Sequence, residues 1–348
     1  MQQKFYLVIL LLAIVQVSFA GNPDRQGEAG ATQLLLNPWA RSAGLSTMTT
    51  ANIAGVEAMR LNVAGLVRSP SRTQIMGGHA RYFDGTGISM NALGLAQKVG
   101  SNGAFGVSIM TMDFGDIPVT TEDFPEGTGA TYAPLFFNMG LSYAHEFENK
   151  VSVGVTARIV SEGLSNLTAT GVSFDAGVQY VTGENEEFKF GISLRNVGTP
   201  LKYRGEGLTQ SLSSPNPEVD QEITFFTRAN QFDMPSLLNI GASYDLVINP
   251  QHRVTIVGNF TSNTFYEDQI GAGVEYVFND MFMLRGGYKY ELDTDQEVQE
   301  SVYTGISAGA SVQVPFNKEK GSNFGIDYAY RHTSVWNGTH NITLRFDL

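Results

Sequence analysis

The sequence predicts an all-β fold, a transmembrane antiparallel outer-membrane β-barrel of about 14 strands with an N-terminal plug segment. Three observations support this prediction: a signal peptide at the start, apolar and polar residues that alternate with period two, and links that are short on one side and long on the other. The composition agrees, because only 16% of the 348 residues are charged and 38 are glycine, whereas soluble proteins carry about 25% charged residues.

The composition also excludes several function classes. Lys and Arg number 22 and Asp and Glu number 34, which gives a formal charge of −12. An acidic chain without a basic block is a poor nucleic-acid binder. Cysteine is absent, which excludes disulfides, thiolate metal sites, cysteine nucleophiles and a lipid-anchored N-terminal cysteine.

Residues 1–20 have the features of a secretory signal peptide. Lys4 supplies the positive charge, an apolar run follows, and small residues lead to a cleavage site before Gly21. The alternative, an N-terminal membrane anchor, is disfavoured because the run is too short to span a bilayer comfortably. An exported chain without a second long apolar stretch is expected to be either soluble outside the inner membrane or a barrel in an outer membrane.

The chain alternates with period two from about residue 73 to its end. In the last segment Ile342, Leu344, Phe346 and Leu348 alternate with polar residues without interruption. A helix would show a spacing near 3.6 instead, and segments of about ten residues with period two are typical of transmembrane barrels. The segments lie near residues 73–83, 87–98, 103–114, 135–147, 150–162, 171–182, 187–196, 235–246, 252–262, 269–278, 281–291, 302–315, 322–333 and 338–348.

The links between these segments give an independent test. Links after even-numbered segments are short and rich in the residues that tight turns require. The long links, near 115–134, 197–234 and 292–301, all follow odd-numbered segments. The exceptions are the first and last odd links, at residues 84–86 and near 335–336, which are short. This is the polarity of an outer-membrane barrel, so we expect both termini on the periplasmic side and the long loops outside a Gram-negative cell. A secreted β-sandwich, the alternative, also alternates but need not show this parity.

Aromatic residues near the segment ends are expected to face outer-membrane lipid, as in the interfacial girdles of membrane barrels. They are Tyr82, Phe83, Phe147, Tyr180, Phe278, Tyr290, Phe316 and Tyr330. The inward faces carry both signs of charge, which we expect to pair across the lumen. Side chains alone fill a barrel only up to about eight strands, so a larger barrel needs something else inside.

The segment between the signal peptide and the barrel, residues 21–72, is the candidate for that plug, with residues 73–348 forming the barrel. It contains a run of leucines followed by a tryptophan, which can pack against the inner wall. We expect this segment to enter or cap the lumen from the periplasmic side. Arg41, Arg60 and Asn62 are then expected to find polar partners on inward strand faces, because an unpaired buried charge is costly.

Two short motifs in this segment carry a family resemblance. Residues 40–45 read Ala-Arg-Ser-Ala-Gly-Leu and residues 62–66 read Asn-Val-Ala-Gly-Leu. The pair resembles the A-R-x-x-x-M-G and N-P-A-G-L motifs of PorV/PorQ-family barrels, although Leu45 and Val63 stand where the family has Met and Pro. The resemblance rests on Arg41, Gly44, Asn62, Ala64, Gly65 and Leu66.

The resemblance implies a function. PorV/PorQ-family proteins are outer-membrane components of the type IX secretion system, and they resemble the 14-stranded fatty-acid-transporter barrels, which have an N-terminal plug. The resemblance implies a non-enzymatic barrel whose extracellular loops bind the signal domains of exported cargo, the translocon or the attachment complex. The architecture alone leaves a second function open, a transporter that passes a hydrophobic small molecule across the outer membrane.

Residues for catalysis or metal binding are sparse. The five histidines are scattered without the spacing of a metal site or a zincin motif. We therefore predict no catalytic residue, no metal and no cofactor. A Ser/His pair that uses His145 or His332 is the remaining enzymatic alternative.

The link at 197–234 is too long for a simple connection and contains many apolar residues between prolines. We expect Tyr203, Leu208, Phe225 and Phe226 to form an apolar docking patch for secretion partners at its outer end. The alternative is that these residues fold inward as a lid over the lumen.

Overall fold

The computed structural model describes residue 25 and residues 27–213, 221–292, 301–317 and 321–348. The predicted signal peptide, residues 1–20, lies outside these residues. Within the described chain, no helix combines the length and the apolar character needed to cross a membrane.

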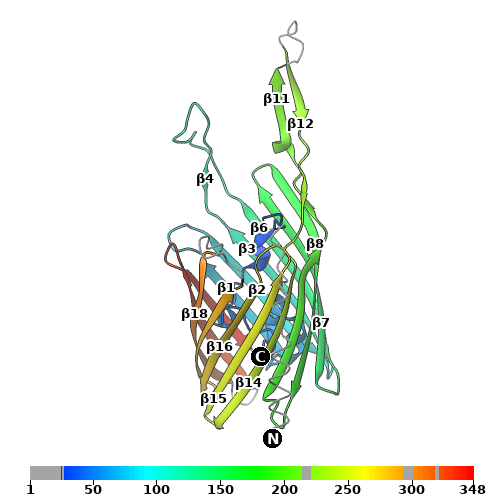
Figure 1. The fold of residues 1–348 in the computed structure, drawn as a ribbon, viewed down its shortest axis with the longest axis vertical. Coiled ribbons are helices and arrows are strands. Elements are labelled where there is room, and N and C mark those ends of the chain that lie inside the picture. Colours follow the sequence, from blue (N-terminus) through cyan, green and yellow to red (C-terminus); the bar gives the residue numbers. More distant parts are fainter. Residues whose placement is uncertain (1–24, 26, 214–220, 293–300, 318–320) are drawn as a thin grey trace.

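The described chain forms a closed antiparallel barrel of 14 strands in chain order (Figure 1). The strands are β1 (Thr73–Arg81), β2 (Ser89–Val99), β3 (Gly103–Asp113), β6 (Leu135–Glu146), β7 (Val151–Leu164), β8 (Leu167–Thr182), β9 (Phe188–Gly198), β14 (Leu237–Asn249), β15 (His252–Asn263), β16 (Gln269–Phe278), β17 (Phe282–Glu291), β18 (Tyr303–Asn317), β19 (Ser322–Thr333) and β20 (Thr339–Asp347). The barrel closes where β1 pairs with β20, from Gln74 opposite Asp347 to Arg81 opposite His340. The predicted antiparallel barrel and its strand count are confirmed.

The strand boundaries agree with the period-two segments to within a few residues. The largest difference is β8, which begins at Leu167 rather than near residue 171. The long links, 114–134, 199–236 and 292–302, all follow odd-numbered strands of the barrel. We call the end that carries them the long-link end and the opposite end the short-turn end.

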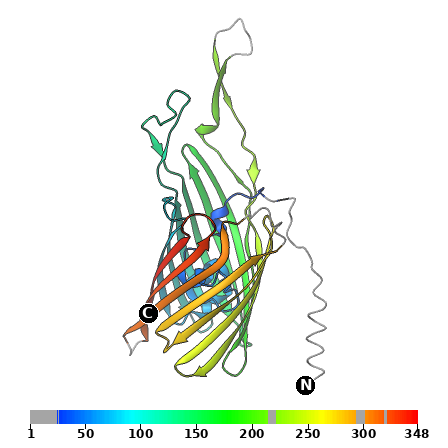
Figure 2. The same cartoon turned by 60° about the vertical axis from the view of Figure 1, so that its left-hand side comes forward.

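The long links contain short hairpins that the sequence did not predict. In the first link β4 (Ile117–Pro118) pairs with β5 (Thr131–Tyr132). In the second link β10 (Leu201–Lys202) pairs with β13 (Gln231–Phe232), and β11 (Thr209–Ser213) pairs with β12 (Glu222–Phe226). Figures 1 and 2 show the β4 and β11–β12 hairpins rising from the same end of the barrel.

The alternation places apolar side chains outside and polar side chains inside. On β8, for example, Val172, Phe174 and Val178 are exposed, whereas Ser173 and Asp175 are buried. Such an apolar outer wall suits lipid. The girdle prediction is wrong for Tyr82, which is 1% exposed and donates a hydrogen bond from its hydroxyl to the Asn37 carbonyl, 3.3 Å away. Tyr82 continues the inward phase of Met76 and Ala80, and its backbone N–H still donates to the Ile88 carbonyl across the β1–β2 hairpin.

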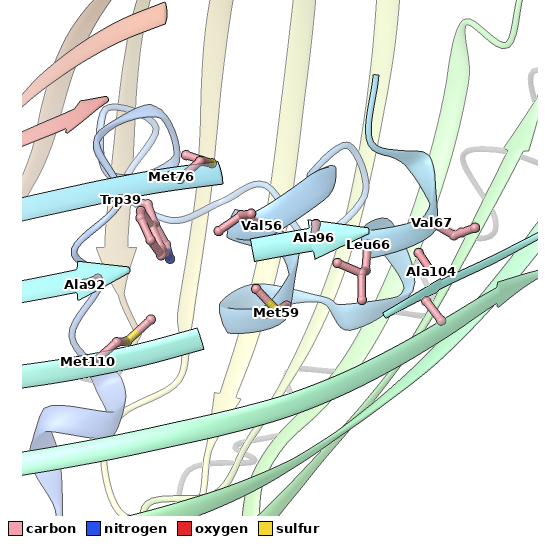
Figure 3. Close-up of a cluster of buried hydrophobic side chains, with 11 residues drawn as sticks. Trp39, Val56, Met59, Leu66, Val67, Met76, Ala92, Ala96, Ala104 and Met110 are labelled. Carbon is pink, nitrogen blue, oxygen red and sulfur yellow. The ribbon is translucent and has the colours of Figure 1, made fainter. Parts of the chain in front are cut away.

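Residues 29–69, which we call the lumenal segment, lie inside the barrel. The segment is irregular except for short helical turns, which are η2 (Thr32–Leu35), α2 (Ala40–Ala43), η3 (Gly55–Glu57), α3 (Ala58–Leu61) and η4 (Val63–Arg68). Its apolar side chains, among them Trp39, Met59 and Leu66, pack against small and apolar side chains of the inner wall (Figure 3). The main hydrophobic core of the protein is therefore the contact between this segment and the barrel.

The lumenal segment begins at the long-link end. Ala29 forms a parallel bridge with Asp233 in the second long link, and Arg25 forms an ion pair with the same aspartate at 2.9 Å. At the other end Arg68 donates a hydrogen bond to the carbonyl of Lys150, in the short turn before β7. The prediction that the segment enters from the short-turn side is therefore wrong for the described residues. Leu348, which pairs with Thr73, lies at the short-turn end as predicted, whereas the N-terminus lies outside the described residues.

Candidate functional site: a filled lumen and a projecting arm

Inward-facing glycines make room for the lumenal segment. At Gly191 an added Cβ would overlap the carbonyl oxygen of Thr50, and at Gly154 it would lie 2.7 Å from the carbonyl oxygen of Val63. Further overlaps of this kind would occur at Gly94 with Val56, at Gly106 with Met59, at Gly177 with Asn62 and at Gly271 with Met48. The high glycine content thus lets backbone and side chains of the segment approach the wall closely.

The residues of the second family motif seat the segment on the wall. The Asn62 side chain donates hydrogen bonds to the carbonyls of Thr50 at 2.8 Å and of Val178, on β8, at 3.1 Å. Its amide oxygen accepts a bond from the Ala64 backbone, which caps η4. At Gly65 a Cβ would overlap the carbonyl oxygen of Ile53. Leu66 is fully buried. Asn62 thus links the backbone at Thr50 and the turn η4 to strand β8.

The residues of the first motif serve the same purpose on the opposite wall. At Gly44 a Cβ would lie 3.1 Å from the Cα of Gly309 on β18, so only glycine fits there without displacement. Arg41 forms an ion pair with Glu275 on β16 at 3.0 Å, and thus reaches an inward strand face as expected. Arg60 does not. Its guanidinium donates to the carbonyls of Gln33 and Leu36 within the lumenal segment itself.

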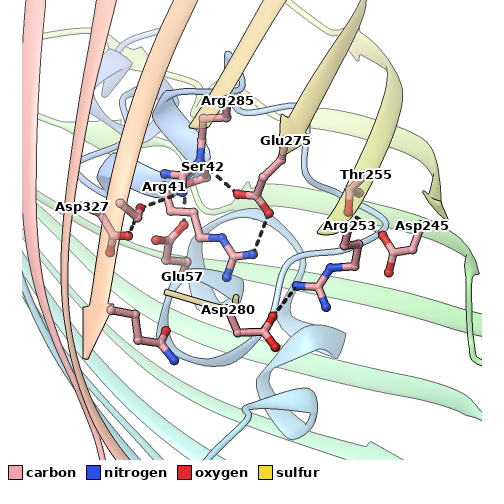
Figure 4. Close-up of polar contacts among 12 residues, drawn as sticks. Arg41, Ser42, Glu57, Asp245, Arg253, Thr255, Glu275, Asp280, Arg285 and Asp327 are labelled. Carbon is pink, nitrogen blue, oxygen red and sulfur yellow. Dashed lines mark hydrogen bonds and ion pairs between the residues drawn. The ribbon is translucent and has the colours of Figure 1, made fainter. Parts of the chain in front are cut away.

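A buried charge network surrounds Arg41 (Figure 4). Glu275 accepts hydrogen bonds from Arg41 and, at 2.9 Å, from Arg285 on the neighbouring strand β17. The Glu57 carboxylate of the segment accepts a bond from the Ser42 backbone at 3.1 Å. Burial and the nearby carboxylate of Asp327 raise the pKa of Glu57. The network holds charges of both signs in contact, as buried charges require.

The cavity beside this network is small. It has a volume of about 30 Å³ and is lined by residues that include Arg41, Thr49, Asn52 and Glu275. That volume suits ordered water, whereas sites for drug-sized ligands are typically about 300 Å³ or larger. The cavity is therefore a small gap between the segment and the wall.

The second long link forms an arm, residues 201–232, whose base rests on the barrel rim. At the base the Tyr203 hydroxyl donates to a carboxylate oxygen of Glu162 at 2.7 Å, and its ring lies 5.6 Å from that of Phe232. Both rings pack against a buried cluster that includes Leu34 of the lumenal segment. Tyr203 therefore belongs to the closure of the mouth. Leu208 lies further out and is half-buried, at the end of the otherwise exposed turn η5 (Glu206–Leu208).

The outer part of the arm is the β11–β12 hairpin. Phe225 lies opposite Gln210, and Phe226 lies opposite Thr209. Because successive strand residues point to opposite faces, the two phenylalanines point in opposite directions. They are 42% and 65% exposed. The prediction that Tyr203, Leu208, Phe225 and Phe226 form one patch is wrong, since the structure distributes them over the base, a turn and two faces.

One face of the hairpin carries three apolar side chains and, opposite Phe225, the polar Gln210. Ile223 lies opposite Leu212 and, two residues along the same face, Phe225 follows. All three side chains are exposed. The other face carries Thr224 and Ser211 beside Phe226. We call the face formed by Leu212, Ile223 and Phe225 the apolar arm face.

The rings of His332 and His340 both lie near the Tyr330 ring, at centroid distances of 6.4 and 5.1 Å, whereas His145 and His252 lie on other strands. Throughout the part of the chain that the structure describes, no group of three or more His, Cys, Asp or Glu residues could hold a metal ion. His145 contacts the Tyr143 hydroxyl, and His332 contacts the hydroxyl of Thr304. Neither contact is with a serine.

Replacing Gly191 by Val is expected to destabilise the barrel, because the new side chain would collide with the Thr50 carbonyl. Overpacking of this kind costs about 1–3 kcal/mol. The matched control is Gly258→Val on β15, where an added Cβ meets no atom within 4 Å. Thermal unfolding in detergent should show a lower midpoint for Gly191→Val and little change for the control. Equal midpoints would show that the segment does not press against this wall.

The fold and the filled lumen define an outer-membrane β-barrel. The family model of the type IX secretion system membrane protein PorP/SprF matches residues 126–346, which is more than half of the chain, so the chain belongs to this family. The PorV/PorQ branch suggested by the motifs is not confirmed. No curated protein matches the sequence.

Two solved structures with a similar fold are described as a transporter and a channel. The Pseudomonas putida toluene transporter TodX has a TM-score of 0.57 at 12% identity, covering 89% of this chain and 97% of TodX. The CymD monoaromatic hydrocarbon channel has a TM-score of 0.55 at 14% identity, covering 90% and 97%. At such identities the likeness establishes the fold alone.

Proposed function

We propose that this barrel is a non-enzymatic component of the type IX secretion system that binds other secretion-system proteins through its arm. The observation that carries the proposal is the apolar arm face, formed by Leu212, Ile223 and Phe225 on a hairpin that projects beyond the barrel. Exposed apolar faces on a projecting element are typical of protein-binding sites. Membership in the PorP/SprF family supports other proteins of the type IX secretion system as the partners.

The candidate partners are the signal domains of exported cargo, the translocon and the attachment complex. We place the short turns in the periplasm and the long-link end outside the cell, following the usual polarity of outer-membrane barrels. The outward apolar side chains then contact outer-membrane lipid. The motif resemblance to PorV/PorQ proteins remains a prediction about the branch, and in this proposal the seated motif residues hold the segment 21–72 as a plug.

A second candidate function is a channel for a hydrophobic small molecule. It is supported by the fold shared with TodX and CymD, whose structures are described as a toluene transporter and a monoaromatic hydrocarbon channel. The close contacts of the lumenal segment with inward glycines and the cavity of about 30 Å³ weigh against it. A lumen sealed in this way offers no apolar path unless the segment moves.

Replacing Leu212, Ile223 and Phe225 together by Ser is expected to reduce recovery of secretion-system proteins in a pull-down by at least tenfold. Each apolar side chain contributes about 1.5–3 kcal/mol when fully buried, and about 1.4 kcal/mol already corresponds to a factor of ten. Barrel insertion should not change, because the arm lies outside the 14 strands of the closed barrel. The matched control is Phe226→Ser on the opposite face, which should retain the partners.

Two results would count against the proposal. Equal recovery by the triple variant and the wild-type protein would exclude the apolar arm face as the docking site. A triple variant that keeps its partners and newly conducts ions would instead identify the arm as a lid and favour the channel.

A further inference from the structure

Three guanidinium groups meet inside the lumen with only one carboxylate. Arg158 on β7 forms an ion pair with Asp175 on β8, at 2.9 Å. Arg60 on α3 and Arg195 on β9 lie within electrostatic reach of both. All four side chains are buried, with no more than 6% exposure. The cluster therefore carries an excess of two positive charges in an environment that is largely closed to water.

The remaining contacts of these arginines are with neutral oxygens. Arg60 donates to the carbonyls of Gln33 at 2.7 Å and Leu36 at 2.8 Å. Arg195 donates to the carbonyl of Leu34 at 3.4 Å. Burial and the neighbouring guanidiniums of Arg158 and Arg195 lower the pKa of Arg60. Arginine nevertheless keeps its proton in proteins, so the excess charge must be compensated in another way.

Several buried donors around the cluster have no hydrogen-bond partner among the described residues. They are Nη1 of Arg60, Nε of Arg195, Nε2 of Gln33 and the hydroxyl of Ser173. Of the acceptors, Oε1 of Gln33 is unpaired as well, and Oδ2 of Asp175 is held by the ion pair with Arg158. Ser173 lies directly opposite Arg158 in the β7–β8 pairing. A buried donor without a partner costs about 1–3 kcal/mol, and more when it is charged. A bound anion would accept hydrogen bonds from the unpaired donors and would also compensate the excess positive charge.

We propose that this cluster binds a small oxoanion of the phosphate or sulfate type inside the lumen. Guanidinium groups match the geometry of such anions and bind them through paired hydrogen bonds. Arg60 and Gln33 belong to the lumenal segment, whereas Arg158, Arg195 and Ser173 belong to the wall. A bound oxoanion would therefore join the segment to three strands, and its release would loosen this contact.

The test uses the purified full-length protein in detergent. Thermal unfolding is followed while inorganic phosphate is titrated against sodium chloride at equal ionic strength. We expect phosphate to raise the unfolding midpoint in a saturable manner, with no equal effect of chloride. Arg195→Gln should weaken the apparent phosphate affinity at least tenfold. The control, Arg253→Gln, removes an exposed charge paired with Asp280 and should leave the phosphate response unchanged.

A second measurement does not depend on any variant. Crystals of the wild-type protein soaked in sodium selenate should give an anomalous selenium peak among Arg60, Arg158 and Arg195. Absence of that peak at saturating selenate would overturn the proposal. So would phosphate and chloride curves that coincide at equal ionic strength, or a phosphate response that Arg195→Gln does not weaken.

Discussion

Deletion of residues 29–69 is expected to open a conducting pore through the barrel, whereas the intact chain is expected to carry no resolvable current. The lumenal segment supplies the side chains that fill the lumen, and the wall behind it is lined by glycines and by small polar residues such as Ser193 and Ser243. Without the segment, water and ions would enter, since 14 strands enclose more space than their own side chains can fill. Single-channel recording in planar bilayers measures the change.

The control for this deletion is removal of residues 209–226, which takes away the outer arm and leaves the segment in place. That variant should stay closed. Folding of both variants can be checked by the shift in electrophoretic mobility between unheated and heated samples. A folded deletion variant with the same lack of current as the intact chain would show that the segment does not seal the lumen.

An epitope tag inserted between Gly21 and Arg25 is expected to be accessible on intact cells. The described chain begins at the long-link end, where the Gly30 backbone donates to the Asp233 carbonyl at 3.0 Å. If this end faces outward, the tag should bind antibody as well as a tag at the tip of the arm. A tag in the turn at 250–251 should bind only after the outer membrane is permeabilised.

The outcome that would contradict this expectation is a tag before Arg25 that is labelled only after permeabilisation while the arm tag is labelled on intact cells. Labelling of the 250–251 tag alone on intact cells would instead invert the proposed orientation of the whole barrel. The three positions therefore distinguish the path of the segment from the orientation of the barrel.

The strands could be predicted because their signals are local. Period-two alternation and turn residues depend on neighbouring positions, and they placed the barrel strands to within a few residues. The same reasoning missed the arm hairpin, although Ile223 and Phe225 alternate with Thr224 and gave the signal for a strand. Reading the link as irregular grouped Phe225 with Phe226, which adjacent positions in a strand separate.

The contacts inside the lumen could be predicted from the sequence only in part. The alternation alone assigns Gly177, Gly191 and Glu275 to the face opposite the apolar residues of their strands, but it does not reveal what they contact. Those contacts depend on the path of the lumenal segment, which is fixed by pairings over long sequence separations, such as that of Ala29 with Asp233. For the same reason the partner of Arg41 could be expected to be an inward residue, whereas the carbonyl partners of Arg60 could not.

The most direct test of the proposed function is a photo-crosslink from the arm in native membranes. A photoreactive amino acid replaces Phe225, on the apolar arm face, and the crosslinked protein is identified by mass spectrometry. We expect a secretion-system protein to be captured from position 225 and at least tenfold less from position 226, which faces the other way. Capture of no protein from position 225, under conditions in which secretion is intact, would contradict docking through this face.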